Sequence, residues 1–336
     1  MKSLYPISLI YYGLYKLDRK FTKPKKLQKP VISVGNITFG GTGKTPIVIE
    51  LLKLLVKKKI SPTVLTRGYL RKTKKAVILT NGNIDMDVSI TGDEPMLIAK
   101  SVPKASVIIG SDRYSNAGRF TDQLNTDVYV LDDGFQHWNI KRDLDIVCVN
   151  TFNPFGSGML IPAGILREPI NSLRRADIIV LTNSDMVTNV ELENLKKKIL
   201  SLTGKDPVVT CYSNFEYIDL DLKTVFDIRY LKESNLYSLS AVGFTNGFKN
   251  SILKSGLKIK DSIVLRDHSN FDNKFLTDIV KKYQNAYFIV TAKDAVKFKD
   301  IDESVRGKII VLKVTPKFIT GKLQWENSIL NTLQSF

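Results

Sequence analysis

The stretch VISVGNITFGGTGKTP, residues 31–46, decides the fold. An apolar run of strand character leads into a turn with three glycines and then into a helix-forming segment that begins at Lys44. In such a unit, backbone N–H groups and the positive end of the helix converge on phosphate oxygens. Lys44 can reach the β- and γ-phosphates, and the Thr45 hydroxyl can hold Mg²⁺. The stretch predicts a nucleotide site made of Thr38, Phe39, Gly40, Gly41, Thr42, Gly43, Lys44 and Thr45.

One position departs from the strict phosphate-loop spacing. The pattern G-x-x-x-x-G-K-[ST] would require glycine at position 38, where this chain has Thr38. The strand before the loop and the helix after it still favour phosphate binding over a merely glycine-rich turn.

Short β-branched runs alternate with amphipathic stretches from Pro30 onward, which is typical of βα units around a parallel sheet. The pattern predicts an α/β fold: a P-loop NTPase-like, doubly wound, mostly parallel sheet with a smaller C-terminal α/β lobe. Strands are expected at 31–34, 63–66, 106–109, 128–131, 146–149 and 178–181, and in the lobe at 236–242, 259–265, 288–291 and 309–314. Helices are expected at 44–58, 94–101, 113–121 and 190–202. The polar break at 204–207 separates a P-loop domain, 29–203, from the C-terminal lobe, 204–336. Residues 1–28 are expected to form an N-terminal helix and a basic linker.

The N-terminal segment 4–17 is rich in Leu, Ile and Tyr, and basic residues follow it. The apolar run ends before the roughly 20 residues that a membrane span requires. We expect an interfacial helix, which meets lipid with its apolar face and anionic headgroups with its cations. The alternative is a helix docked on the protein's own core.

A second motif, VYVLDDGFQH at 128–137, is an apolar strand that ends in two carboxylates. Phosphate-loop enzymes place an acidic residue at such a strand end to hold Mg²⁺ directly or through water. Asp132 and Asp133 are therefore both metal candidates. The alternative is a solvated turn, which the phosphate loop makes less attractive.

The composition narrows the class of partner. The 336 residues carry 50 Lys+Arg against 33 Asp+Glu, a formal charge of +17 that favours an anionic partner. The sequence contains no recognisable nucleic-acid-binding motif, so nucleic acid is not expected as a partner. Cys148 and Cys211 lie far apart in apolar runs and are expected to be buried, reduced thiols.

Two further residues have ordinary explanations when they are taken alone. Asp93, in the turn TGDEP, is typical of a helix N-cap. His268 is one of only two histidines, and a lone histidine is more often structural than catalytic.

Taken together, the motifs GNITFGGTGKTP, TRGYLR, GDEP, LDDGFQH, GILREP, RADIIVLTN, DH and TAKDAVKF resemble, in the same order, the tetraacyldisaccharide 4'-kinase family of lipid A biosynthesis. The resemblance runs from residue 4 to about residue 300. It implies a kinase that moves the γ-phosphate of ATP, with Mg²⁺, to the 4'-hydroxyl of an acylated disaccharide phosphate. It also implies a peripheral location at an anionic membrane surface, on the cytoplasmic face of the inner membrane of a Gram-negative-type bacterium.

The resemblance implies a role for several residues. Lys44 and Arg167 would gather the charge of the transferred phosphoryl group. Asp93 would accept the proton of the sugar hydroxyl, with His268 as its partner. Possible contacts to substrate or around the metal are Arg67, Glu94, Gln136, His137 and Glu168. The pair Lys293 and Asp294 also matches, without an assigned role.

Two other functions compete with the kinase. A P-loop switch or energy-coupling NTPase would carry a guanine-recognition motif or a metal-delivery cluster, and the sequence shows neither. A non-catalytic membrane module that holds nucleotide only for structure would not need Asp93 and His268.

Overall fold

The computed structural model describes residues 4–81, 83–84, 86–220, 224–243, 245–266, 269, 271–298 and 301–336. The chain forms two compact units. The first contains Met1–Ile84, Ile98–Cys211 and Phe318–Phe336, and the second contains Asp85–Leu97 and Tyr212–Lys317. The predicted division at 28 and 203 differs from these units, because the N-terminal segment belongs to the first unit, the change near residue 211 falls within β8 (Val208–Ile218), and the chain returns to the first unit at Phe318.

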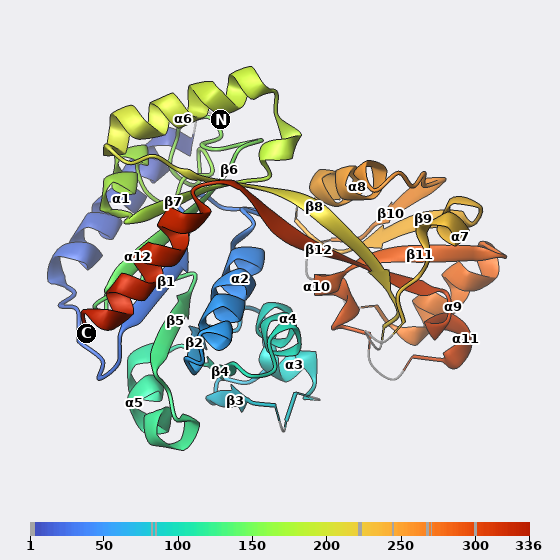
Figure 1. Ribbon diagram of the computed structural model, residues 1–336, viewed down its shortest axis with the longest axis horizontal. Helices are drawn as coiled ribbons and strands as arrows, with labels where there is room; N and C mark the ends of the chain where they lie inside the picture. The colour runs from blue at the N-terminus through green and yellow to red at the C-terminus, as the bar shows by residue number, and fades with distance from the viewer. Residues whose placement is uncertain are drawn as a thin grey trace. The chain divides into compact units, whose positions relative to one another are not determined.

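The first unit is built on a mostly parallel sheet with the strand order β8-β7-β6-β1-β5-β2-β4-β3 (Figure 1). Among the described strand pairs of this unit, only β3 at the edge pairs antiparallel, with β4. All residues of β1, β5 and β6 are buried, as expected for a sheet covered on both faces. The strands are β1 (Val31–Gly35), β2 (Pro62–Thr66), β3 (Val77–Leu79), β4 (Ser106–Ile109), β5 (Val128–Asp132), β6 (Leu144–Asn150), β7 (Ile178–Thr182) and β8 (Val208–Ile218).

The helices of the first unit cover this sheet. The apolar side of α2 is fully buried at Ile47, Leu51 and Leu55, and Ala117 of α5 packs with Tyr129 and Leu131 of β5. The C-terminal helix α12 belongs here as well, and its Trp325 is buried. The helices are α1 (Tyr5–Phe21), α2 (Lys44–Lys57), α4 (Asp93–Ser101, which begins in the second unit), α5 (Arg113–Leu124), η2 (Ile170–Arg175), η3 (Ser184–Met186), α6 (Asn189–Thr203) and α12 (Lys322–Gln334).

The second unit is built on strands in the order β10-β9-β11-β12-β8. Alternate residues of β11 enter two different cores: Phe288 and Val290 pack in one, and Ile289 packs in the other. This alternation shows that the sheet is covered on both faces. The further elements are α3 (Val88–Thr91), α7 (Ile228–Lys232), β9 (Asn235–Ser240), α8 (Thr245–Lys254), β10 (Asp261–Val264), α9 (Asn273–Lys282), β11 (Ala286–Thr291), α10 (Ala292–Ala295), α11 (Glu303–Arg306) and β12 (Ile309–Thr320).

The position of β1 determines where a ligand can bind in the first unit. β1 lies between β5 and β6, and all three strands run parallel. In open α/β sheets, ligands bind beyond the carboxyl ends of the strands, where the strand order reverses. The segments that follow β1 and β5 meet at this point, and they contain the glycine-rich loop and Asp133.

Helix α1 lies on the first unit through one side only. Ser8 is buried, whereas Ile10, Leu14 and Phe21 are more than half exposed. Over the described ranges of the chain, no helix combines the length and the apolarity that crossing a bilayer demands. The inner side of α1 therefore agrees with a helix docked on the protein, and its outer side remains apolar.

Candidate active site

The glycine-rich loop is held by side chains from three strand ends. The fully buried Asn36 donates to the Thr38 carbonyl at 2.7 Å and to the Thr42 hydroxyl at 2.9 Å. Asn150, at the end of β6, donates to the Gly41 carbonyl at 2.9 Å, and Thr182, at the end of β7, donates to the Thr42 carbonyl at 2.8 Å. The position of the loop therefore depends on the three side chains that bond its carbonyls.

Gly43 joins the loop to helix α2 at a point where a side chain would fit poorly. Its φ of 73° lies in the left-handed region, and an added Cβ would lie 3.2 Å from the Cβ of Thr182. Helix α2 begins at Lys44, directly after this glycine, with Thr45 as its second residue. The N-terminus of α2 is thus placed at the end of the loop, as the sequence predicted.

A charged cluster of Lys44, Asp133 and Arg167 lies beside the loop. The Lys44 ammonium lies 2.9 Å from one carboxylate oxygen of Asp133 and 3.1 Å from the Asn36 side-chain oxygen. Arg167 donates to both Asp133 oxygens, at 3.0 and 2.8 Å, and its guanidinium lies over the Phe39 ring. Burial would raise the pKa of Asp133, but the charges of Lys44 and Arg167 outweigh it and lower the pKa well below its usual range. The cluster therefore pairs two cations with one ionised carboxylate.

Asp132 is in a different environment from its neighbour. It is buried at the end of β5 and accepts a hydrogen bond of 2.9 Å from the Thr66 hydroxyl, at the end of β2. Arg113, at the start of α5, is buried, and burial lowers the pKa of its guanidinium. The negative charges of Asp132 and Asp133 raise this pKa, whereas the positive charge of Arg67, an exposed residue that directly follows Thr66, lowers it. Arg113 was not predicted as a site residue.

Glu168 is the fully buried centre of a polar network. It forms an ion pair of 2.8 Å with Arg175 and accepts hydrogen bonds from Gln136 at 2.7 Å and from the Tyr15 hydroxyl at 2.6 Å. Gln136 also donates to the Asn36 carbonyl at 2.8 Å. The structure thus brings the predicted Gln136 and Glu168 together with the charged cluster, and adds Tyr15, Asn36 and Arg175, which the sequence did not indicate.

Asp93 and Glu94 belong to the second unit, where two lysines of the TAKDAVKF motif face them. Lys293 lies 3.1 Å from Glu94 and 3.7 Å from Asp93, and Lys297 lies 3.9 Å from Asp93. Lys297 is itself fixed by the buried Asp294 at 2.9 Å. The motif therefore holds the start of α4. His268, the predicted partner of Asp93, lies outside the described residues.

His137 stays neutral at physiological pH. Burial, together with the charges of Arg113 and Arg142, lowers its pKa to about 4. Among the atoms of the described chain its Nε2 is buried without a hydrogen-bond partner. The neutral ring therefore supplies no positive charge to the site.

The shifted pKa of His137 predicts a pH dependence of stability. Between pH 6.5 and 4 the unfolded chain binds a proton at this residue that the folded chain does not, so the free energy of unfolding falls as the pH falls through that window. Between pH 7 and 4.5, we expect the free energy of unfolding of His137→Gln to fall by about 1–2 kcal/mol less than that of the parent, after allowance for the partial exposure of the ring. Urea unfolding of both proteins at the two pH values measures this. Equal losses would contradict the assigned pKa.

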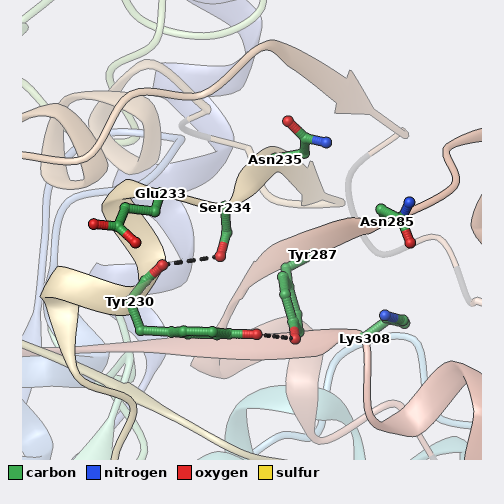
Figure 2. A pocket seen from close by; sticks show the side chains of 7 residues that line it. All are labelled: Tyr230, Glu233, Ser234, Asn235, Asn285, Tyr287 and Lys308. Carbon is green, nitrogen blue, oxygen red and sulfur yellow. Dashed lines mark hydrogen bonds between the residues drawn. The ribbon is translucent and has the colours of Figure 1, made fainter.

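Among the described residues, no group of three or more His, Cys, Asp or Glu side chains could hold a metal ion. Figure 2 shows a hollow in the second unit where the hydroxyls of Tyr230 and Tyr287 meet at 2.6 Å. It contains none of the predicted site residues and is lined by Tyr230, Glu233, Ser234, Asn235, Asn285, Tyr287 and Lys308. Of the two cysteines, Cys148 is buried as expected, whereas Cys211 is half-buried.

Comparisons with known proteins agree with the family that the motifs indicated. The family model described as tetraacyldisaccharide-1-P 4'-kinase matches residues 1–334. A tetraacyldisaccharide 4'-kinase from Halothermothrix orenii is 32% identical over 326 residues, covering 90% of this chain and 84% of that protein. A tetraacyldisaccharide 4'-kinase from Aquifex aeolicus is 34% identical over 305 residues, covering 88% of this chain and 90% of that protein. The crystal structure of LpxK from Aquifex aeolicus in complex with ATP superposes with a TM-score of 0.79 at 30% identity and covers 99% of both chains. The predicted family is confirmed.

Proposed function

Because the chain belongs to the tetraacyldisaccharide-1-P 4'-kinase family, we infer that it transfers the γ-phosphate of ATP to the 4'-hydroxyl of a tetraacyl glucosamine disaccharide 1-phosphate. The observation that carries this inference is the charged cluster of Lys44, Asp133 and Arg167 at the end of the glycine-rich loop. Its two cations are placed to receive the oxygens of a nucleotide phosphate. The product would be the 4'-phosphorylated lipid A precursor.

Phosphoryl transfer requires positioning and charge stabilisation more than covalent chemistry from the protein. The 4'-oxygen attacks the γ-phosphorus, the bond to the β,γ-bridging oxygen breaks, and ADP leaves. Lys44 and Arg167 stabilise the charge that gathers on the phosphoryl oxygens. The loop amides and the N-terminus of α2 bind the remaining phosphates. Asn36, Asn150 and Thr182 bond the carbonyls of the loop and so limit the reorganisation that nucleotide binding needs.

The residues around the loop also fit Mg²⁺. Magnesium in such sites takes one or two protein oxygens and otherwise phosphate and water, so a cluster of three carboxylates is not required. The Thr45 hydroxyl and the Asp132 carboxylate supply suitable oxygens, whereas Asp133 is paired with Lys44 and Arg167. We assign the metal to Thr45 and Asp132, where it would neutralise the β- and γ-phosphates.

This assignment predicts different effects for the two aspartates. Asp132→Asn should raise the Mg²⁺ concentration for half-maximal rate by about tenfold or more, because a metal ligand loses its charge. Asp133→Asn should instead lower kcat with little change in the Mg²⁺ requirement, because the cations lose their shared carboxylate. Mg²⁺ titrations of the two variants and the parent measure this. A larger shift for Asp133→Asn would reverse the assignment.

Asp93 is the proposed acceptor of the proton from the 4'-hydroxyl, with His268 as its partner. Lys293 and Lys297 lie within 4 Å of its carboxylate and set its orientation. A base that is held in one orientation by neighbours loses less entropy when it meets the hydroxyl. Glu94, bonded to Lys293, contributes to the same arrangement.

The outer side of α1 is the proposed contact with an anionic membrane surface. It exposes large apolar side chains, and Lys16, Arg19 and Lys20 lie on the same helix. An apolar side with adjacent cations complements anionic headgroups above acyl chains. We propose that the protein lies peripherally on the cytoplasmic face of the inner membrane. Leu14→Glu should leave the protein folded but keep it in the supernatant when anionic vesicles are sedimented.

A kinase assay tests the proposed function directly. The protein is incubated with labelled ATP, Mg²⁺ and the tetraacyl disaccharide 1-phosphate in detergent. Label on the 4' position supports the kinase. ATP hydrolysis without lipid labelling would favour an energy-coupling NTPase, and neither product would favour a module that only holds nucleotide.

A further inference from the structure

Three hydroxyl-bearing side chains of helix α1 face the protein, whereas large apolar side chains of the same helix are exposed. Ser8, Tyr11 and Tyr15 share one side of the helix, being spaced three and four residues apart. The Ser8 hydroxyl donates to the Leu160 carbonyl at 2.9 Å and accepts from the Ala163 amide at 3.1 Å. Directed hydrogen bonds therefore fix the position of α1 on the protein, which apolar packing alone would define less closely.

The other two polar residues of this side reach the active-site segment. The Tyr11 hydroxyl donates to the carbonyl of Arg167 at 2.8 Å, and the Tyr15 hydroxyl donates to the Glu168 carboxylate at 2.6 Å. Arg167 is the residue that pairs with Asp133 at the phosphate loop. A change in the position of α1 would thus act directly on the backbone that carries Arg167.

Glu168 extends the connection to the loop itself. Its side chain is fully buried, and its oxygens accept from Tyr15, Gln136 and Arg175. Gln136 uses the same nitrogen to hold the Asn36 carbonyl, and the Asn36 side chain contacts Lys44. Buried polar networks of this kind transmit a change because a broken bond leaves a buried group unsatisfied.

We propose that Tyr15 is a positioning residue through which the binding of α1 to an anionic lipid surface strengthens nucleotide binding at the phosphate loop. The proposal rests on the proposed function, in which α1 meets the membrane and the loop binds ATP. A lipid surface that fixes α1 would fix Tyr15, and with it Glu168, Gln136 and Asn36. The protein would then bind ATP most tightly where its lipid substrate is found.

Such coupling must be reciprocal. The factor by which vesicles raise the affinity for nucleotide equals the factor by which nucleotide raises the affinity for vesicles. A purely structural role of Tyr15 would alter the affinity for nucleotide equally with and without vesicles. The ratio of the two affinities therefore isolates the coupling.

The test measures the affinity of the full chain for a fluorescent, non-hydrolysable ATP analogue, with and without phosphatidylcholine–phosphatidylglycerol vesicles that lack substrate. The variant Tyr15→Phe removes only the hydroxyl that bonds Glu168. The control Tyr12→Phe removes a hydroxyl from the same helix, from a ring whose centroid lies 6.2 Å from that of Tyr15, and leaves the partners of Glu168 in place. Sedimentation verifies that each protein binds the vesicles.

We expect vesicles to raise the affinity of the parent and of Tyr12→Phe by about fivefold or more, and that of vesicle-bound Tyr15→Phe by less than about twofold. A parental response in Tyr15→Phe would overturn the proposal. So would a parent that phosphorylates the disaccharide but shows no vesicle effect, and in that case the kinase function would stand. A parent that neither phosphorylates the lipid nor binds vesicles would overturn the proposed function and this inference with it.

Discussion

Replacing Lys44 with alanine should lower kcat by about 10³-fold or more, the scale on which cations at a transferring phosphoryl group act. The Lys44 ammonium lies 2.9 Å from Asp133 and 3.1 Å from the Asn36 oxygen, at the start of α2. Without it, Arg167 alone would face the phosphoryl charge, and part of its own charge is neutralised by Asp133. Initial rates with saturating ATP and lipid measure the loss.

Lys53→Ala is the matched control for this prediction. Lys53 lies on the same helix, forms an exposed ion pair with Glu50 and should be dispensable for turnover. Circular dichroism and thermal unfolding of both variants check that the fold is kept. Near-parental activity in folded Lys44→Ala would show that the glycine-rich loop is not the phosphate site.

The strands of the first unit could be predicted because most of them are buried on both faces and are therefore apolar throughout. The expected ranges 106–109 and 178–181 differ from β4 and β7 by at most one residue. β3 was missed because three residues at a sheet edge carry too little pattern. β8 was missed because its sequence, VVTCYSNFEYI, mixes apolar and polar residues. This strand begins in the first unit and ends in the second.

The unit boundaries could not be predicted from local pattern. The segment 85–97 precedes β4 in the chain and was assigned to the first domain, yet it belongs to the second unit. Glu94 and Lys293 form an ion pair although they lie 199 residues apart in the sequence. Local hydrophobic periodicity cannot predict a contact between such distant positions. The same contact gives Lys293 the structural role that the sequence left open.

The site divides in a similar way. Motifs pointed to Lys44, Asp133 and Arg167, and the structure places them in one cluster. The residues that hold this cluster in place were not predicted. Asn36 resembles an ordinary loop residue, and Tyr15 resembles an ordinary member of an apolar helix. Signals did exist: a polar Asn between an apolar strand and a glycine-rich loop, and tyrosines spaced along one side of α1.

The glycine-rich loop and Asp93 are the two parts of the proposed mechanism that can be separated by kinetics. The loop binds nucleotide whether or not the acceptor hydroxyl is present. Asp93 acts only when that hydroxyl reacts. Substitutions at Asp93 should therefore change kcat while the affinity for ATP stays close to that of the parent.

Asp93→Ala should lower kcat by about 10²–10⁴-fold, the usual contribution of a positioned general base. His268→Ala should change kcat in the same direction. If the two residues act as one unit, the double variant should be little slower than the slower single variant, because either loss already removes the proton acceptor. Rates and KM values for both substrates across this cycle provide the measurement.

Two controls separate proton transfer from the placement of α4. Asp93→Asn keeps the size of the side chain beside Lys293 and Lys297 but removes its basicity, so its rate should fall about as far as that of the alanine variant. Glu94→Gln weakens only the Lys293 contact and should cost much less. Losses that add in log rate would mean that Asp93 and His268 act independently. A rise in KM for ATP alone would instead identify Asp93 as a nucleotide contact, and the base would have to be sought elsewhere.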